Sequence, residues 1–205
     1  PEGYIRVGFA EYDEFKIAGA YSAPLSERTA LRIAFDHTES NEGWIENLSP
    51  GFDDPMQGKN TSARLRLTSQ LTDEFELGLI YENNSSDGLL SHGAFLTDNR
   101  ELASPEIGLA NITLEPLKTY STIDSDFERD YELFSVTVSW DLPFGTLDSI
   151  SAVQDYDYFR LHDGVSTDAL LIILDSDTTT ETFTQELRLS GVGESLDWII
   201  GGYFM

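Results

Sequence analysis

Apolar and polar residues alternate along much of this chain. In the segment 29–36 every second residue is apolar, and the residues between them are polar or small. A β-strand places successive side chains on opposite faces, whereas an α-helix repeats near 3.6 residues. The pattern therefore predicts strands with one apolar and one polar face. The same alternation is found in 63–68, 75–82 and 183–190.

The alternating segments and the turn residues between them predict an all-β chain, with few stretches of helical periodicity. We expect roughly nine strands, at about 2–12, 14–23, 28–39, 59–70, 74–83, 130–141, 147–160, 181–190 and 195–205. Their connections are of two kinds. Four are short, at 23–27, 71–73, 142–146 and 191–194, and three are long and polar, at about 40–58, 84–129 and 161–180.

The order of short and long connections indicates the architecture. Antiparallel neighbours place successive connections at opposite ends of a sheet, so the long ones share one end, together with the short connection at Asp13. A compact soluble domain rarely holds a structureless loop of the length of 84–129, whereas outer-membrane barrels combine short periplasmic turns with long extracellular loops. The sequence predicts a segment of an antiparallel, up-and-down transmembrane β-barrel.

Aromatic residues agree with this interpretation, because barrels carry aromatic girdles at both membrane interfaces. The alternative is that these residues form the core of a soluble sandwich. The residues concerned are Tyr4, Phe9, Tyr12, Trp140, Phe144, Tyr156, Tyr158 and Phe159.

Composition narrows the possible functions. The chain has 205 residues, 37 Asp and Glu against 12 Lys and Arg, a net charge of -25 and no cysteine. This charge repels polyanions, which excludes a typical nucleic-acid binder or a basic membrane-surface module. Disulfides and thiolate metal sites are excluded as well. No apolar run approaches the roughly 18 residues of a membrane-spanning helix.

Few residues suggest metal binding or catalysis. Asp175, Asp177 and Glu181 place carboxylates at alternating positions and are weak metal candidates, and Asp53–Asp54 is a second candidate, although each is more simply a solvated acidic loop. We expect no resident cofactor. His37, His92 and His162 fall in or next to predicted loops, without a serine at a recognisable spacing, so we do not expect an enzyme.

Charged residues on the polar faces of the strands are expected to point into the barrel lumen, because arginine is costly on a lipid-facing surface. In the lumen they form either a structural lattice of ion pairs or the wall that packs against a plug and lines a substrate path. The residues are Arg32, Asp36, Arg64, Arg66, Glu76, Glu186 and Arg188.

Several motifs, taken in order, resemble those of one family. They are YSAPLSERTALRIAF at 21–35, GWIEN at 43–47, GKNTSARLRL at 58–67, TQELRLS at 184–190 and LDWIIGGYF at 196–204. In this order they are similar to barrel segments of TonB-dependent outer-membrane receptors.

The resemblance implies that residues 1–205 are part of one barrel domain, with a plug domain before them and further strands after them. It also implies contact with outer-membrane lipid, coupling to TonB through the plug, and TonB-dependent uptake of a nutrient, which is a small molecule or a metal chelate such as an iron–siderophore complex. Two alternatives remain: a secreted or surface β-sandwich for carbohydrate binding or adhesion, and a small complete barrel.

Overall fold

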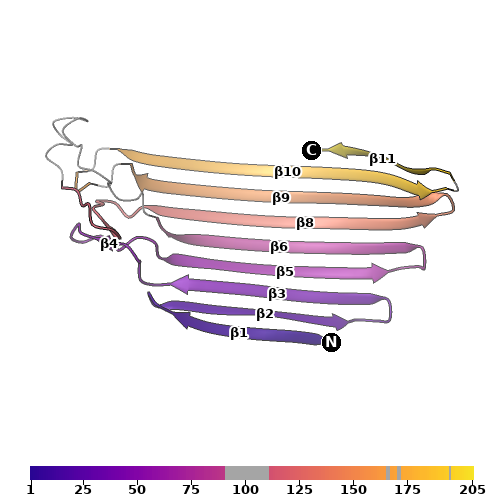
Figure 1. Ribbon diagram of the computed structural model, residues 1–205, viewed down its shortest axis with the longest axis horizontal. Coiled ribbons are helices and arrows are strands. Elements are labelled where there is room, and N and C mark those ends of the chain that lie inside the picture. The colour runs from indigo at the N-terminus through magenta and orange to yellow at the C-terminus, as the bar shows by residue number, and fades with distance from the viewer. Residues whose placement is uncertain (91–110, 165–166, 170–171, 194) are drawn as a thin grey trace.

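The computed structural model describes residues 1–90, 111–164, 167–169, 172–193 and 195–205. All of its regular elements are strands, as the alternation predicts (Figure 1). Their bounds are β1 Glu2–Ala10, β2 Glu14–Pro24, β3 Thr29–Ser40, β4 Glu46–Asn47, β5 Gly58–Gln70, β6 Phe75–Leu89, β7 Lys118–Thr119, β8 Asp126–Leu142, β9 Gly145–Asp163, β10 Ile173–Val192 and β11 Asp197–Phe204.

Nine of these strands form one sheet in the order β1-β2-β3-β5-β6-β8-β9-β10-β11, and every neighbouring pair is antiparallel. This up-and-down order and the strand number confirm the predicted fold class. The long connections gather at one end of the sheet, beside β4 (Figure 1). The sheet is not closed, because β1 and β11 lie at its opposite edges. The two-residue strands β4 and β7 pair in parallel within the loops.

Several strands extend further toward the loop end than the alternation predicts. β6 continues to Leu89, β8 begins at Asp126 and β10 begins at Ile173, so the predicted loops at 84–129 and 161–180 are too long. β9 likewise continues to Asp163, so His162 lies in a strand rather than in a loop, whereas His37 lies in β3, within the predicted strand 28–39. His92 is outside the described residues. The added segments are mostly polar, with only scattered apolar residues such as Phe127 and Leu174. A strand without a repeating apolar face leaves no period-two signal even though its backbone is paired.

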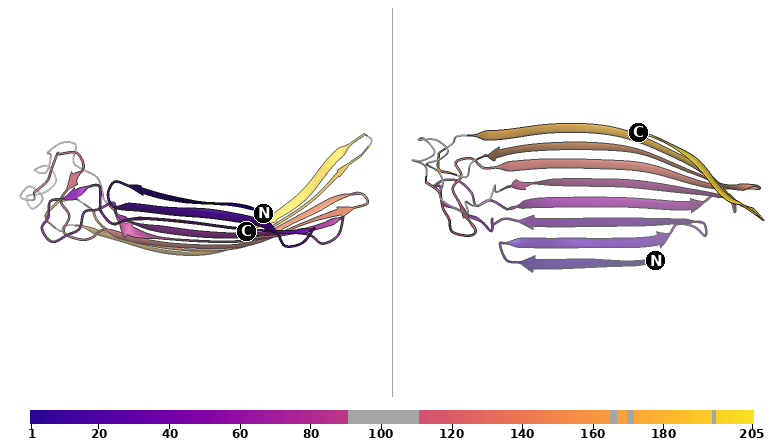
Figure 2. Two further views of the ribbon diagram at one scale, coloured as in Figure 1. Left: turned by 90° about the horizontal axis from the view of Figure 1, so that it is seen from below. Right: turned by 45° about the horizontal axis from the view of Figure 1, so that its top comes forward.

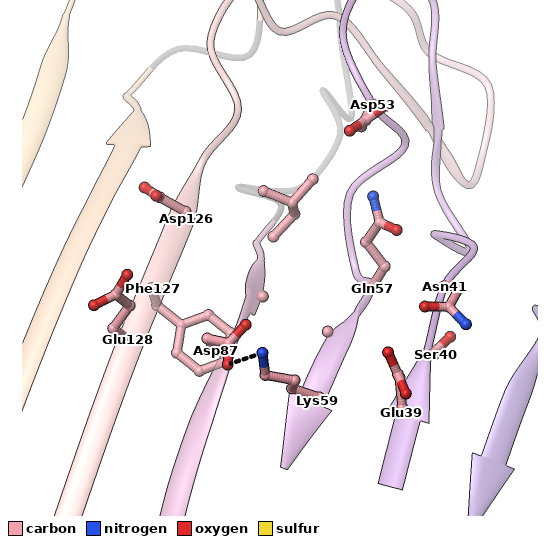
Figure 3. A pocket seen from close by; sticks show the side chains of 13 residues that line it. Glu39, Ser40, Asn41, Asp53, Gln57, Lys59, Asp87, Asp126, Phe127 and Glu128 are labelled. Carbon is pink, nitrogen blue, oxygen red and sulfur yellow. Dashed lines mark ion pairs between the residues drawn. The ribbon is translucent and has the colours of Figure 1, made fainter.

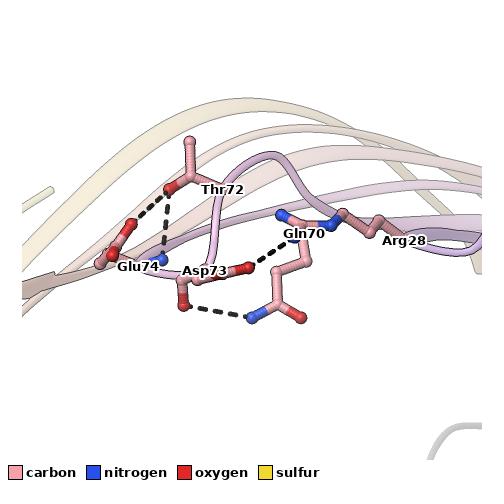
Figure 4. A network of polar contacts seen from close by, with 5 residues as sticks. All are labelled: Arg28, Gln70, Thr72, Asp73 and Glu74. Carbon is pink, nitrogen blue, oxygen red and sulfur yellow. Dashed lines mark hydrogen bonds and ion pairs between the residues drawn. The ribbon is translucent and has the colours of Figure 1, made fainter.

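Tight turns connect the strands at the opposite end, and neighbouring turns are tied together. The Arg28 guanidinium, from the β2–β3 turn, donates to Asp73 of the β5–β6 turn at 2.6 Å (Figure 4). Gln70 also donates to the Asp73 carbonyl, at 3.4 Å, and Thr72 Oγ1 accepts from the Glu74 backbone N–H at 3.2 Å. These bonds stabilise the hairpins where the strand ladders end.

The β8–β9 turn depends on a glycine. Gly145 has a φ of +157°, and a Cβ there would collide with the Ser190 carbonyl of β10. We expect Gly145→Val to destabilise the folded sheet by about 1–3 kcal/mol, through backbone strain and displacement of β10. Gly202→Val is the matched control, because the space beside Gly202 is open. Urea titration of the full-length protein measures both; equal midpoints would contradict the prediction.

The sheet is a single curved layer without an interior core (Figure 2). Among the described residues Ala20 is the one buried apolar side chain, at 6% exposure. Over residues 128–135 of β8 and 153–158 of β9, residues on one face are more shielded than their neighbours on the other face, as in Tyr131 against Asp130 and Tyr156 against Asp157. A concave surface crowds its side chains, so the shielded face is the concave one.

Candidate functional site

The register divides the side chains of the sheet into two faces. Paired residues of antiparallel strands point to the same side, so cross-strand rows can be followed through the sheet. One such row is apolar throughout: Ile33, Leu65, Tyr81, Phe134, Val153 and Phe183. The side of the sheet that holds this row is called the apolar face below, and the opposite, concave side is called the polar face.

All seven charged residues predicted to share a polar side lie on the polar face. The ion pairs there join Arg64 to Glu82 at 3.4 Å and Arg188 to Asp148 at 3.3 Å. Both are solvent-accessible, so each contributes about 0–1 kcal/mol. The partner Asp148 was missed, because it meets Arg188 across β9 and β10. A long connection joins these two strands, so no short turn in the sequence indicates their register. The seven are Arg32, Asp36, Arg64, Arg66, Glu76, Glu186 and Arg188.

The suggested metal ligands do not form one cluster. Asp175, Asp177 and Glu181 all lie on β10, where an extended chain separates the first from the last by about 20 Å. Asp54 instead accepts a hydrogen bond from the Asn47 backbone N–H at 2.7 Å, and the Asp53 backbone N–H donates to Asp124 at 3.3 Å. In the part of the chain that the structure describes, no group of three or more His, Asp or Glu side chains could hold a metal ion.

Charge separates sharply between the faces at the loop end of β5, β6, β8, β9 and β10. On the loop side of Glu82, the polar face of these strands carries Arg129 and Arg160 and no carboxylate, whereas the apolar face carries eleven carboxylates and Lys59. At this end of the sheet the polar face is therefore positively charged and the apolar face is negatively charged. The carboxylates are Asp87, Asp126, Glu128, Asp130, Glu132, Asp155, Asp157, Asp163, Asp175, Asp177 and Glu181.

Beyond the strands, the loops 41–57 and 111–125 are joined through Asn47. Its Nδ2 donates to the Asp53 and Ser121 carbonyls, both at 3.3 Å, and its Oδ1 accepts from the backbone N–H groups of Ser49 and Ser121, both at 3.1 Å. The parallel pairing of β4 with β7 adds backbone bonds between the same loops. The resulting unit is called the loop cluster. Sequence reasoning missed it, although Asn47 lies in the quoted GWIEN motif.

Two further contacts complete the loop cluster. Lys118 lies 2.9 Å from Glu115 and 3.4 Å from Glu46, and these two carboxylates, Glu115 first, raise the pKa of Lys118 above its ordinary value. The Asn111 side chain and backbone N–H both donate to Asp168, which joins a third loop to the cluster. Three loops that are distant in sequence thus form one polar cap at the end of the sheet.

A hollow lies between this cap and the ends of the strands (Figure 3). Its volume is about 370 Å³, and its lining includes Lys59, 3.3 Å from Asp87. The other acidic lining residues are Glu39, Asp53, Asp126 and Glu128. With five carboxylates and one lysine, this hollow repels anions. The polar face, on the other side of the sheet, carries arginines instead.

A curved antiparallel layer with long loops at one end, tight turns at the other and two chemically distinct faces is the architecture of a wall segment of an up-and-down β-barrel. Among the described residues there is no helix long and apolar enough to span a membrane. The sequence matches no family model and no curated protein.

Solved structures do match the fold. The ferric yersiniabactin uptake receptor FyuA from Yersinia pestis superposes with a TM-score of 0.71 at 18% identity, over 98% of this chain and 30% of that chain. The siderophore receptor PirA from Acinetobacter baumannii superposes with a TM-score of 0.57 at 17% identity, over 97% of this chain and 28% of that chain. The chain thus spans under a third of the length of each.

Proposed function

We propose that these residues form part of the barrel wall of a TonB-dependent outer-membrane receptor, which takes up a nutrient such as an iron–siderophore complex. The two matched structures support the class of function, since one is a ferric yersiniabactin uptake receptor and the other is a siderophore receptor. In this proposal residues 1–205 belong to one barrel domain. The plug domain and the remaining strands lie outside the segment, and TonB acts through the plug.

The observation that carries the proposal is the uncovered apolar face. Phe9 is 80% exposed, Ile5 71% and Phe204 64%, and the apolar row from Ile33 to Phe183 is also solvent-accessible. Soluble proteins rarely expose a continuous apolar patch of this extent. A β-sandwich would need a second sheet over this face, and the described residues supply only β4 and β7 besides the main sheet. Lipid hydrocarbon is the cover that fits.

The apolar residues of the apolar face form a band, called the apolar band. The border of this band crosses the strands obliquely, at the angle expected for tilted strands in a membrane. On the apolar face of β8 the apolar residues end at Phe134, and the next residue on that face is Glu132. On β1 they continue as far as Phe9, which lies in the same cross-strand row as Glu128 of β8. Between β8 and β1 the border of the band therefore shifts by about 20 Å along the strand direction, while the two strands are about 24 Å apart across the sheet. This corresponds to an inclination of about 40°, the tilt of strands in outer-membrane barrels.

Tyr81 marks the interface of the outer leaflet in this arrangement. It lies at the upper end of the band, and its hydroxyl donates to Glu132 at 3.0 Å, on the charged side of the border. An aromatic ring in the acyl region with its hydroxyl in the headgroup region is the typical interfacial position of tyrosine. The polar face then lines the lumen, the loop cluster faces the outside, and the turns at Arg28 and Asp73 face the periplasm.

The test uses the full-length gene in its own host. Uptake of radioiron-labelled siderophores is measured under iron limitation in wild-type cells, in a deletion of this gene, and in a deletion of tonB. We expect loss of uptake of at least one chelate in both deletions, and recovery of the full-length protein in the outer-membrane fraction. Recovery in a soluble fraction, or unchanged uptake of all chelates together with unchanged growth on vitamins and oligosaccharides, would contradict the proposal.

A further inference from the structure

We propose that the lumen wall of this receptor is built to select an anionic ligand, with Arg129 as the residue that determines specificity. The inference rests on the proposed function and adds the charge class of the ligand. It starts from the separation of charge described above: in a chain of net charge -25, the loop end of the lumen wall carries arginines and no carboxylate over β5, β6, β8, β9 and β10.

Arg129 has neutral partners only. Its Nη2 donates to Asn84 Oδ1 and to Ser86 Oγ, both at 2.9 Å, and it forms no ion pair within the described ranges of the chain. Its Nε is shielded from solvent and has no hydrogen-bond partner among those residues. Six other described Lys and Arg residues have a carboxylate partner: Lys16, Arg28, Lys59, Arg64, Lys118 and Arg188. Here the adjacent residues Glu128 and Asp130 point to the other face of the sheet.

The acceptors of Arg129 are themselves held in place. Asn84 Nδ2 donates to Asn60 Oδ1 at 2.8 Å and to Ser62 Oγ at 2.7 Å, and Ser86 Oγ donates to Asn60 Oδ1 at 2.6 Å. This network spans β5 and β6 and fixes one end of the guanidinium without neutralising its charge. The Nη1 donors of Arg129, which have no partner among the described residues, are therefore left for an anion, to which a charge-assisted bond is about twice as strong as a neutral one.

Tyrosines extend the array across β8 and β9. Tyr131 pairs with Tyr156 in register, Arg129 pairs with Tyr158, and the rings of Tyr156 and Tyr158 stack with centroids 6.3 Å apart. A tyrosine hydroxyl keeps its proton at neutral pH, so Tyr131 is available there as a hydrogen-bond donor. An arginine beside three phenols offers donors and aromatic surface, which suits an anionic ligand with planar groups.

The apolar-face carboxylates sharpen this selection. Anions are repelled from the outside of the barrel end and from the acidic hollow around Lys59, so the lumen wall is the favourable surface for a negative ligand. Fields of this kind are screened within about 8 Å at physiological ionic strength. The affinity for the ligand should therefore decrease as salt is added.

The experiment measures equilibrium dialysis of radioiron-labelled chelates with the full-length receptor in detergent. The probes are an anionic ferric tris-catecholate, a neutral cyclic ferric tris-hydroxamate and a cationic linear ferric tris-hydroxamate. The variants are Arg129→Gln, Arg129→Lys, and the matched control Arg28→Gln, which removes the same charge at the periplasmic turn. Gln keeps an amide that can donate to Asn84 or Ser86, so Arg129→Gln should fold.

We expect the tris-catecholate to bind best, with roughly tenfold or greater loss in Arg129→Gln, partial rescue in Arg129→Lys and no change in Arg28→Gln. Preference of the wild-type protein for the neutral or cationic chelate would overturn the inference, as would unaltered binding of the tris-catecholate to Arg129→Gln or no binding of it at all. TonB-dependent uptake of a neutral chelate would leave the proposed function intact while refuting the anionic ligand.

Discussion

Replacing Leu65 by arginine is expected to prevent assembly of the barrel. Leu65 lies on the apolar face of β5, paired with Ile33 on one side and Tyr81 on the other, and 39% of its surface is exposed. In the proposed membrane frame that exposed surface contacts lipid. Arginine at such a depth costs about 2–4 kcal/mol, a large fraction of the net stability of a folded domain.

The matched control is Thr68→Arg, three residues further along the same strand. Thr68 lies on the polar face, paired with Ala30, which has only a methyl group, and with Gly78, which has no side chain. We expect it to change the free energy of unfolding by less than about 1 kcal/mol. Heat-modifiable migration of the full-length protein from outer membranes measures assembly, and urea titration in vesicles measures stability. Equal effects of the two substitutions would contradict the assignment of the faces.

How far the sequence predicts this fold depends on the apolar face. Where a strand crosses the band, as at Leu65 and Phe134, period-two alternation locates it and assigns its faces correctly. Beyond the band toward the loops both faces are mostly polar, so Asn84–Asp87 and Asp175–Thr180 are predicted as loop although their backbones are paired in β6 and β10. Beyond the apolar band, the ends of the strands are specified by backbone pairing with neighbouring strands, and a single sequence does not display that pairing.

The candidate site was predictable to a similar degree. Basic residues are rare in this chain, so Arg32, Arg64, Arg66 and Arg188 could be singled out from the sequence. Their positions in the alternating pattern of each strand correctly placed them together on the polar face. Arg129 and Asn47 were not found, because each functions through neighbours that are brought close by the register or by loop packing. Arg129 is surrounded in sequence by carboxylates that point to the opposite face. Its isolation from them is apparent only in the sheet.

Removing the Asn47 side chain is expected to open the loop cluster while leaving the barrel folded. In Asn47→Ala the backbone N–H groups of Ser49 and Ser121 lose their acceptor, and two carbonyls lose a donor. Each backbone group left unsatisfied and shielded costs about 1–3 kcal/mol. Hydrogen exchange at 46–49 and 118–121 should therefore accelerate roughly tenfold or more, with heat-modifiable migration unchanged.

Two further variants test whether the effect comes from the position of Asn47 between the two loops or from the loss of any side-chain amide. Asn41→Ala removes one exposed bond, to Asp13 at 3.1 Å, and should leave exchange in both segments near the wild-type rate. Asn47→Asp keeps the acceptor and loses the donor, so it should fall between wild type and Asn47→Ala. Acceleration confined to 46–49 would refute coupling through Asn47. If both loops open together and only the closed cluster binds ligand, the apparent affinity for the ligand falls in proportion to the fraction of molecules that stay closed.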